Sequence, residues 1–166
     1  LSLVGSEMCI RDRYNKETTE QLTDELLSED ENKYHAFLIL DVDCFKQIND
    51  IYGHAVGDIV LQKFGKLLKG TFREGDILGR IGGDEFGVIM KNIQTKDIAM
   101  KKAEELLAKT QAYKIDELKG NNISISIGIS TAPQDGDCYM DLYKRADQAL
   151  YQAKRSGKAR VCNYFS

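Results

Sequence analysis

The chain has 166 residues, 42% of them apolar and 30% charged, which is typical of one globular domain with a core of its own. Its net charge of −3 means that no overall basic field attracts nucleic acid or an anionic membrane. The four scattered cysteines favour a reducing cytoplasm, and the longest apolar run, residues 36–40, is too short to span a bilayer. Any membrane anchor of a longer protein would therefore lie outside this chain.

Residues 1–13 do not match the rest of the sequence. The stretch from Leu3 to Asp12 resembles the translation of one reading frame of a transposase sequencing adapter, and Ser2 and Arg13 suit the adjoining bases. The stretch lacks the cationic start and the long apolar run of a signal peptide. We therefore expect a non-native, adapter-derived tail at 1–13, with a disordered native tail as the alternative. One domain is expected at 14–166, and an upstream sensor domain is expected to be missing.

The spacing of apolar residues predicts a mixed succession of helices and strands. A glycine pair at 82–83 lies between two short apolar runs and indicates a hairpin. In chain order we expect a helix at 15–28, a strand at 36–42, helices at 43–52 and 56–71, strands at 77–81 and 86–90, a helix at 98–113, a strand at 123–129, a helix at 140–156 and a strand at 161–165. This order predicts an α/β (α+β) domain, with a central mixed sheet of about five strands flanked by helices.

Several side chains have expected structural roles. Isoleucines alternate with serine and glycine at 123–129, which predicts a half-exposed strand. His35 is expected at the surface. The last long helix is expected to be packed by Tyr139, Tyr143 and Tyr151.

Carboxylates follow the strand at 36–42 and fill the glycine turn. Asp41 ends the strand, while Asp84 and Glu85 lie at the tip of the turn. Carboxylates at strand ends can share hard divalent cations, and such cations bind phosphates. Asp43 can cap the helix that follows it. These residues indicate nucleotide chemistry.

The turn after Asp43 is a candidate phosphate site. The N–H groups of Cys44 and Phe45 would point toward an anion, as they do at the start of many helices. Lys46 would add a positive charge beside them.

Four motifs in order resemble the GGDEF family of diguanylate cyclases. They occupy residues 41–50, 52–58, 80–86 and 149–158, and the resemblance covers residues 14–166. It implies a palm-like nucleotidyl-cyclase fold. The implied enzyme condenses two GTP molecules into cyclic di-GMP and two pyrophosphates, at the interface of a homodimer in which each domain holds one GTP.

The resemblance also implies a role for each matching residue. The implied metal ligands, for two Mg²⁺ or Mn²⁺ ions per active site, are Asp41, the Val42 carbonyl, Asp84 and Glu85, of which Asp84 and Glu85 are also catalytic. The implied triphosphate ligands are Cys44, Phe45, Lys46, Lys154 and Lys158. The implied guanine ligands are Asn49 and Asp58, with Leu61 lining the base pocket. A carboxylate at Asp58 suits the N1–H and N2–H₂ donors of guanine, which adenine does not offer in that arrangement.

Arg73 and Asp76 form an RxxD pair before the glycine turn, at the distance usual in the family. The resemblance implies an inhibitory site for cyclic di-GMP there, with Arg73 on guanine and phosphate and Asp76 accepting from guanine. The alternative is an ordinary charged turn after a helix.

The chain departs from the family pattern at two places. A DxLTGLxN-type motif that usually precedes the first helix is reduced to Tyr14-Asn15-Lys16, and Ala159 stands where Asn is frequent. Three functions remain open: an active diguanylate cyclase, a non-catalytic module that binds GTP or cyclic di-GMP, and a sister cyclase that uses adenine. The complete set of carboxylates favours the first, and Asp58 argues against the third. Neither nucleic acid nor a membrane is expected as a partner of this fragment.

Overall fold

The computed structural model describes residues 14–29 and 32–164 of the chain. Five strands form one sheet in the order β2-β3-β1-β4-β5. The strands are β1 (Tyr34–Val42), β2 (Ile77–Arg80), β3 (Glu85–Ile93), β4 (Ile125–Ala132) and β5 (Val161–Asn163). The β4–β5 pair is parallel and the other pairs are antiparallel. The expected mixed sheet with a β2–β3 hairpin is therefore confirmed.

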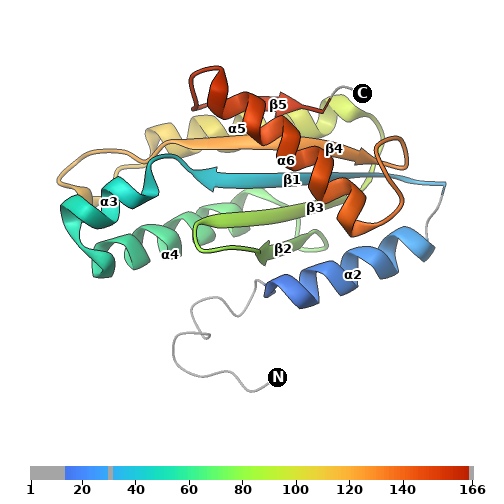
Figure 1. Cartoon of the computed structure of the whole chain (residues 1–166), viewed down its shortest axis with the longest axis horizontal. Coiled ribbons are helices and arrows are strands. Elements are labelled where there is room, and N and C mark those ends of the chain that lie inside the picture. Colours follow the sequence, from blue (N-terminus) through green and yellow to red (C-terminus); the bar gives the residue numbers. More distant parts are fainter. Residues whose placement is uncertain (1–13, 30–31, 165–166) are drawn as a thin grey trace.

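Helices cover both faces of the sheet. They are α2 (Lys16–Glu29), α3 (Phe45–Tyr52), α4 (His54–Thr71), α5 (Lys96–Ala112) and α6 (Tyr139–Arg155), with a 3₁₀ turn η1 (Asp116–Leu118). In Figure 1, α6 crosses one face of the sheet, while α4 and α5 lie on the opposite face. The helix α2 packs along β2 on the α6 side. The expected order of helices and strands is confirmed.

The central strand β1 separates two hydrophobic cores. Leu38 and Leu40 belong to the core beneath α4 and α5, whereas Phe37 and Ile39 belong to the core beneath α2 and α6. Successive side chains of a strand point to opposite faces, so Asp41 shares the face of Phe37 and Ile39. Asp41 therefore lies on the face of the sheet that α6 covers.

The strand β4 is buried on both faces, so the expectation of a half-exposed strand at 123–129 is wrong. Its serine and glycine face lies directly under α6. A Cβ atom on Gly128 would lie 2.2 Å from the Ala146 carbonyl oxygen, and the Ser130 hydroxyl donates to the Leu142 carbonyl at 2.7 Å. The small residues therefore permit close helix packing and do not mark exposure to solvent.

Two other expectations about side chains are wrong. His35 is buried, and its Nδ1 accepts a hydrogen bond from the Asn92 N–H at 3.0 Å. Tyr151 is 58% exposed, whereas Tyr139 is buried as expected.

The adapter-derived tail expected at 1–13 lies outside the described residues. Within the described ranges, no helix is both long and apolar enough to cross a membrane.

Candidate active site

Three carboxylates meet at one end of the sheet. Asp41 of β1 lies directly opposite Glu85 of β3 in the antiparallel register. Side chains of directly opposed residues point to the same face, so both carboxylates lie on the α6 side. Asp84 precedes Glu85, and its carbonyl accepts the Val42 N–H at 3.4 Å. The structure therefore brings together all four positions expected to ligate metal.

The glycine turn that presents Asp84 and Glu85 is held by its own backbone. The N–H groups of Ile81 and Gly82 both donate to the Glu85 carbonyl, at 2.9 and 3.2 Å. Arg80 donates through Nε to the Gly82 carbonyl at 3.3 Å and through Nη2 to the Gly83 carbonyl at 2.6 Å. We did not anticipate this role of Arg80 from the sequence. These hydrogen bonds hold the turn that carries the two acids.

The buried negative charge of the carboxylates is only partly balanced by nearby positive charge. Burial raises the pKa of Asp41 to about 6, and the neighbouring Asp84 carboxylate adds to the shift, although a hydrogen bond from Lys154 opposes it. Burial also raises the pKa of Glu85, against a hydrogen bond from Tyr143. Partial burial acts to lower the pKa of Lys154, but its contact with Asp41 outweighs this effect and raises the pKa overall. The site as a whole favours the approach of a cation.

The donor set fits a hard divalent cation. Among the described residues, Oδ1 of Asp41 is buried without a hydrogen-bond partner, and the surrounding donors are carboxylate and carbonyl oxygens. The oxygens of the three acids do not all lie within 4.8 Å of one another. Lys154 contacts Oδ2 of Asp41, and Tyr143 contacts Oε1 of Glu85. Oδ1 of Asp41 therefore remains for a cation while Oδ2 contacts Lys154.

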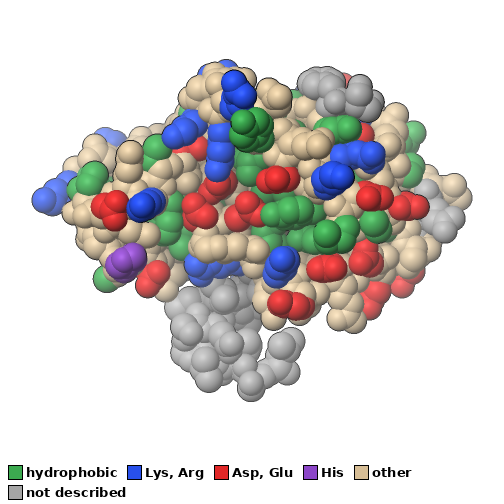
Figure 2. Space-filling view, in the orientation of Figure 1, with side chains coloured by type: hydrophobic (Ala, Val, Ile, Leu, Met, Phe, Trp, Pro, Cys, Tyr) green, Lys and Arg blue, Asp and Glu red, His purple; other side chains and the backbone are tan. Residues whose placement is uncertain are grey.

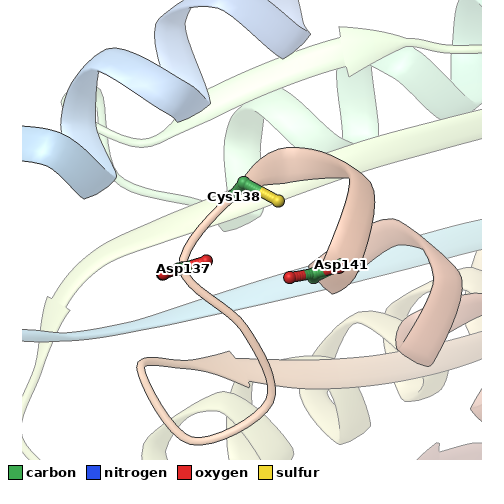
Figure 3. A group of neighbouring side chains, drawn as sticks. All are labelled: Asp137, Cys138 and Asp141. Atoms are coloured by element: carbon green, nitrogen blue, oxygen red, sulfur yellow. The ribbon is translucent and has the colours of Figure 1, made fainter.

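A tighter group of potential ligands lies at the other end of α6. Asp137, Cys138 and Asp141 offer ligand atoms within 4.8 Å of one another. Figure 3 shows these three neighbouring side chains. Both aspartates are exposed: Asp141 lies in the first turn of α6, and Asp137 lies just before the helix. Acidic side chains at that position stabilise the positive end of the helix dipole. Helix stability therefore accounts for this group.

The turn after β1 lies next to the segment that follows α6. Cys44 has a left-handed backbone, with φ of 56°, and its Sγ accepts a hydrogen bond from Lys158 Nζ at 3.2 Å. Lys46 is exposed on the first turn of α3. The structure thus brings together two elements expected to hold the triphosphate, although they lie more than a hundred residues apart.

Asp43 does not cap α3, so that expectation is wrong. The N-cap position is taken by Cys44, and no side chain caps the helix. The Asp43 carboxylate instead accepts hydrogen bonds from the Ser124 and Ser126 hydroxyls, at 2.6 and 2.7 Å, and from the Ala159 N–H at 3.2 Å. Asp43 therefore ties the phosphate turn to β4 and to the segment after α6.

The expected guanine ligands gather where α3 meets α4. Asn49 is half-buried on α3, Asp58 is exposed on α4, and Leu61 is buried one turn further along α4. A Cβ atom on Gly57 would lie only 1.9 Å from Oδ1 of Asn49. Gly57 thus permits the close approach of Asn49, a role that we did not anticipate.

The RxxD pair lies apart from these residues, between α4 and β2. Asp76 is buried, and its carboxylate accepts from the N–H groups of Arg73 and Lys91, both at 3.1 Å. The Arg73 side chain is 58% exposed, and its Nη2 donates to Asp76 Oδ1 at 3.2 Å and to the Lys91 carbonyl. In this arrangement Arg73 and Asp76 bind each other.

Figure 2 shows the charge on the face that α6 crosses. Acidic side chains gather near the centre of this face, with lysine and arginine side chains around them. The pattern suits a polyanionic ligand bound through cations and basic side chains.

The sequence matches the family model described as "Diguanylate cyclase, GGDEF domain" over residues 12–160. It is 40% identical over 127 residues to Diguanylate cyclase A of Treponema denticola, covering 76% of this chain and 34% of that protein. It is also 40% identical over 127 residues to the response regulator PleD of Caulobacter vibrioides, covering 75% of this chain and 28% of that protein. The chain therefore spans about a third or less of the length of these relatives.

Solved structures agree in fold. The GGDEF domain of TpbB from Pseudomonas aeruginosa superposes with a TM-score of 0.86 at 32% identity, covering 92% of this chain and 91% of that one. The GGDEF domain of DgcB from Caulobacter crescentus, solved in complex with c-di-GMP, gives a TM-score of 0.82 at 25% identity, with coverage of 93% and 90%. The motifs, the fold and these relatives agree, and the chain belongs to the diguanylate cyclase GGDEF domain family.

Proposed function

We propose that this domain condenses two GTP molecules into cyclic di-GMP and two pyrophosphates. The observation that carries the proposal is the pairing of Asp41 with Glu85 across β1 and β3, with Asp84 beside them and Lys154 above. Carboxylates that share a buried site in this way can hold Mg²⁺ or Mn²⁺, two per active site. Cations bound there would neutralise charge on the triphosphate and increase the acidity of the ribose 3′-hydroxyl.

Each remaining element has a proposed part in binding the triphosphate. The N–H groups of Cys44 and Phe45, together with Lys46, would hold phosphate oxygens at the start of α3. Lys158 would join them from the segment after α6, where it already contacts Cys44. Lys154 would leave Asp41 and pair with a phosphate once GTP arrives.

Asp84 is proposed to accept the proton from the ribose 3′-hydroxyl. The 3′ oxygen of one GTP would then attack the α-phosphate of a second GTP, and pyrophosphate would leave. One site holds one GTP, so two domains must face each other and the active form is a homodimer. Repeating the step with the roles exchanged closes the ring of cyclic di-GMP.

The base is proposed to be read at the α3–α4 junction. The Asp58 carboxylate would accept hydrogen bonds from N1–H and N2–H₂ of guanine. Asn49 would also hydrogen-bond the guanine edge, and Leu61 would line the base pocket. ATP would leave the Asp58 carboxylate without these donors, which supports selectivity for GTP.

Product inhibition is proposed at Arg73 and Asp76. Three donors already occupy the Asp76 carboxylate, and two of them come from Arg73. A guanine of cyclic di-GMP would displace the Arg73 guanidinium from Asp76, and Arg73 would then pair with the ligand.

Two conservative substitutions test the proposed metal site. Asp84→Asn and Glu85→Gln keep side-chain size and remove one charge each. We expect both to lower the formation of cyclic di-GMP from GTP and Mg²⁺ by at least 100-fold, on the order expected for loss of a catalytic group. Circular dichroism would confirm that both variants are folded. Turnover close to that of the unmodified domain in both variants would refute the assignment.

A further inference from the structure

Tyr143 contacts the acidic cluster from the helix above it. Its hydroxyl lies 2.9 Å from Oε1 of Glu85. An ionised carboxylate offers only acceptors, so the tyrosine is the donor in this bond. Tyr143 lies about three helical turns before Lys154 on α6, which places both side chains on the same face of the helix. The helix therefore contacts the cluster twice, through Lys154 on Asp41 and through Tyr143 on Glu85.

Aromatic neighbours hold the Tyr143 ring in place. It stacks on Tyr139, with the ring centroids 5.8 Å apart and the planes inclined by 30°. Phe37 of β1 lies at a centroid distance of 6.4 Å from the same ring and also contacts Tyr139, so the three rings form one cluster. A ring packed in this way gives its hydroxyl little freedom, so the hydrogen bond constrains the orientation of the carboxylate.

We infer that Tyr143 is a positioning residue for Glu85, an inference that rests on the proposed metal site. The hydroxyl fixes Oε1 of Glu85 and leaves Oε2 for a cation. Groups that orient a metal ligand commonly change metal affinity by about 10- to 100-fold when removed. Loss of this single hydroxyl is expected to lie at the lower end, at about tenfold.

The chain supplies a matched control one turn earlier on the same helix. Tyr139 is buried against the same aromatic neighbours, and its hydroxyl has no hydrogen-bond partner among the described residues. Tyr143→Phe and Tyr139→Phe each remove one oxygen atom and keep the ring. Only Tyr143→Phe removes a contact with the carboxylate cluster.

The test is a titration of the metal-free protein with Mn²⁺, followed by the electron paramagnetic resonance signal of free Mn²⁺. We expect Tyr143→Phe to raise the Kd for Mn²⁺ about tenfold and Tyr139→Phe to leave it unchanged. The unfolding midpoints of both metal-free variants should stay within about 4 °C of the parent value. Turnover of Tyr143→Phe should also recover as Mg²⁺ is raised, which a general structural defect would not allow.

A further variant separates this inference from the proposed function. Glu85→Gln should weaken Mn²⁺ binding by itself, and adding Tyr143→Phe to it should have no further effect. Equal Mn²⁺ affinity in Tyr143→Phe and Tyr139→Phe, with Glu85→Gln impaired, would overturn the inference alone. A large loss of metal-free stability in Tyr143→Phe would also overturn it. Absence of Mn²⁺ binding in the parent protein would overturn both the inference and the metal site.

Discussion

Gly57→Ala tests whether the α3–α4 junction binds guanine. The added Cβ atom would lie 1.9 Å from Oδ1 of Asn49, so the amide must withdraw by roughly 1 Å or more to reach a normal contact distance. The helix itself should tolerate the change, because alanine is favoured over glycine in a helix by about 1 kcal/mol. Displacing the amide should cost one hydrogen bond to guanine, about 0.5–1.5 kcal/mol, which corresponds to roughly 2- to 10-fold weaker GTP binding.

The assay compares Gly57→Ala with Gly70→Ala in the same helix. No atom lies within 4 Å of a Cβ added at Gly70, so Gly70→Ala should bind GTP as the parent does. Asn49→Ala should weaken GTP binding to a similar extent as Gly57→Ala, and the double variant should show no additive loss. Calorimetry with GTP and with ATP measures each affinity. A folded Gly57→Ala variant with unchanged affinity for GTP would refute the positioning of Asn49 by Gly57.

Three further predictions concern stability and regulation. The pKa of Asp41 is raised to about 6 from 3.8, so in the metal-free protein this carboxylate binds its proton more tightly in the folded state than in the unfolded state. The free energy of unfolding should therefore fall by up to about 3 kcal/mol as the pH rises from about 4 to about 6. Denaturant titrations across this range should show a smaller fall in Asp41→Asn, and an identical fall would contradict the prediction. Gly128→Ala should destabilise the domain by about 3 kcal/mol or more, since its Cβ would meet the α6 backbone at 2.2 Å; a thermal midpoint within a few degrees of the parent value would contradict this. Arg73→Ala should relieve inhibition by added cyclic di-GMP while turnover persists, and unchanged inhibition would remove the second site.

The order of helices and strands could be predicted from the sequence because local spacing determines it. A buried central strand gives an unbroken apolar run, as at 36–40, and a glycine pair between two apolar runs predicts a hairpin. Burial of β4 could not be predicted in the same way, because its alternating Ser and Gly residues resemble those of an exposed strand. The helix α6 covers the Ser and Gly face of β4, and the local sequence of a strand does not reveal that a helix packs against it.

The positions of the candidate ligands could likewise be anticipated from their motifs, but their contacts could not. Asp43 has the residue type and position of a helix cap, yet it binds serines about eighty residues away. Tyr143 resembles an ordinary packing residue until the helix is placed over the sheet. Ala159 departs from the Asn that is frequent there, and its φ of 50° lies in the left-handed region that Asn tolerates well. Each of these depends on contacts between distant parts of the chain.

The central claim is that two of these domains together convert GTP to cyclic di-GMP. The most direct measurement incubates the purified chain with GTP and Mg²⁺ at several protein concentrations and identifies the product by mass. Our account predicts cyclic di-GMP, formed at a rate that rises faster than linearly with protein concentration because two domains must meet. Absence of product from a folded protein that still binds cyclic di-GMP would contradict the account and favour a non-catalytic binding module.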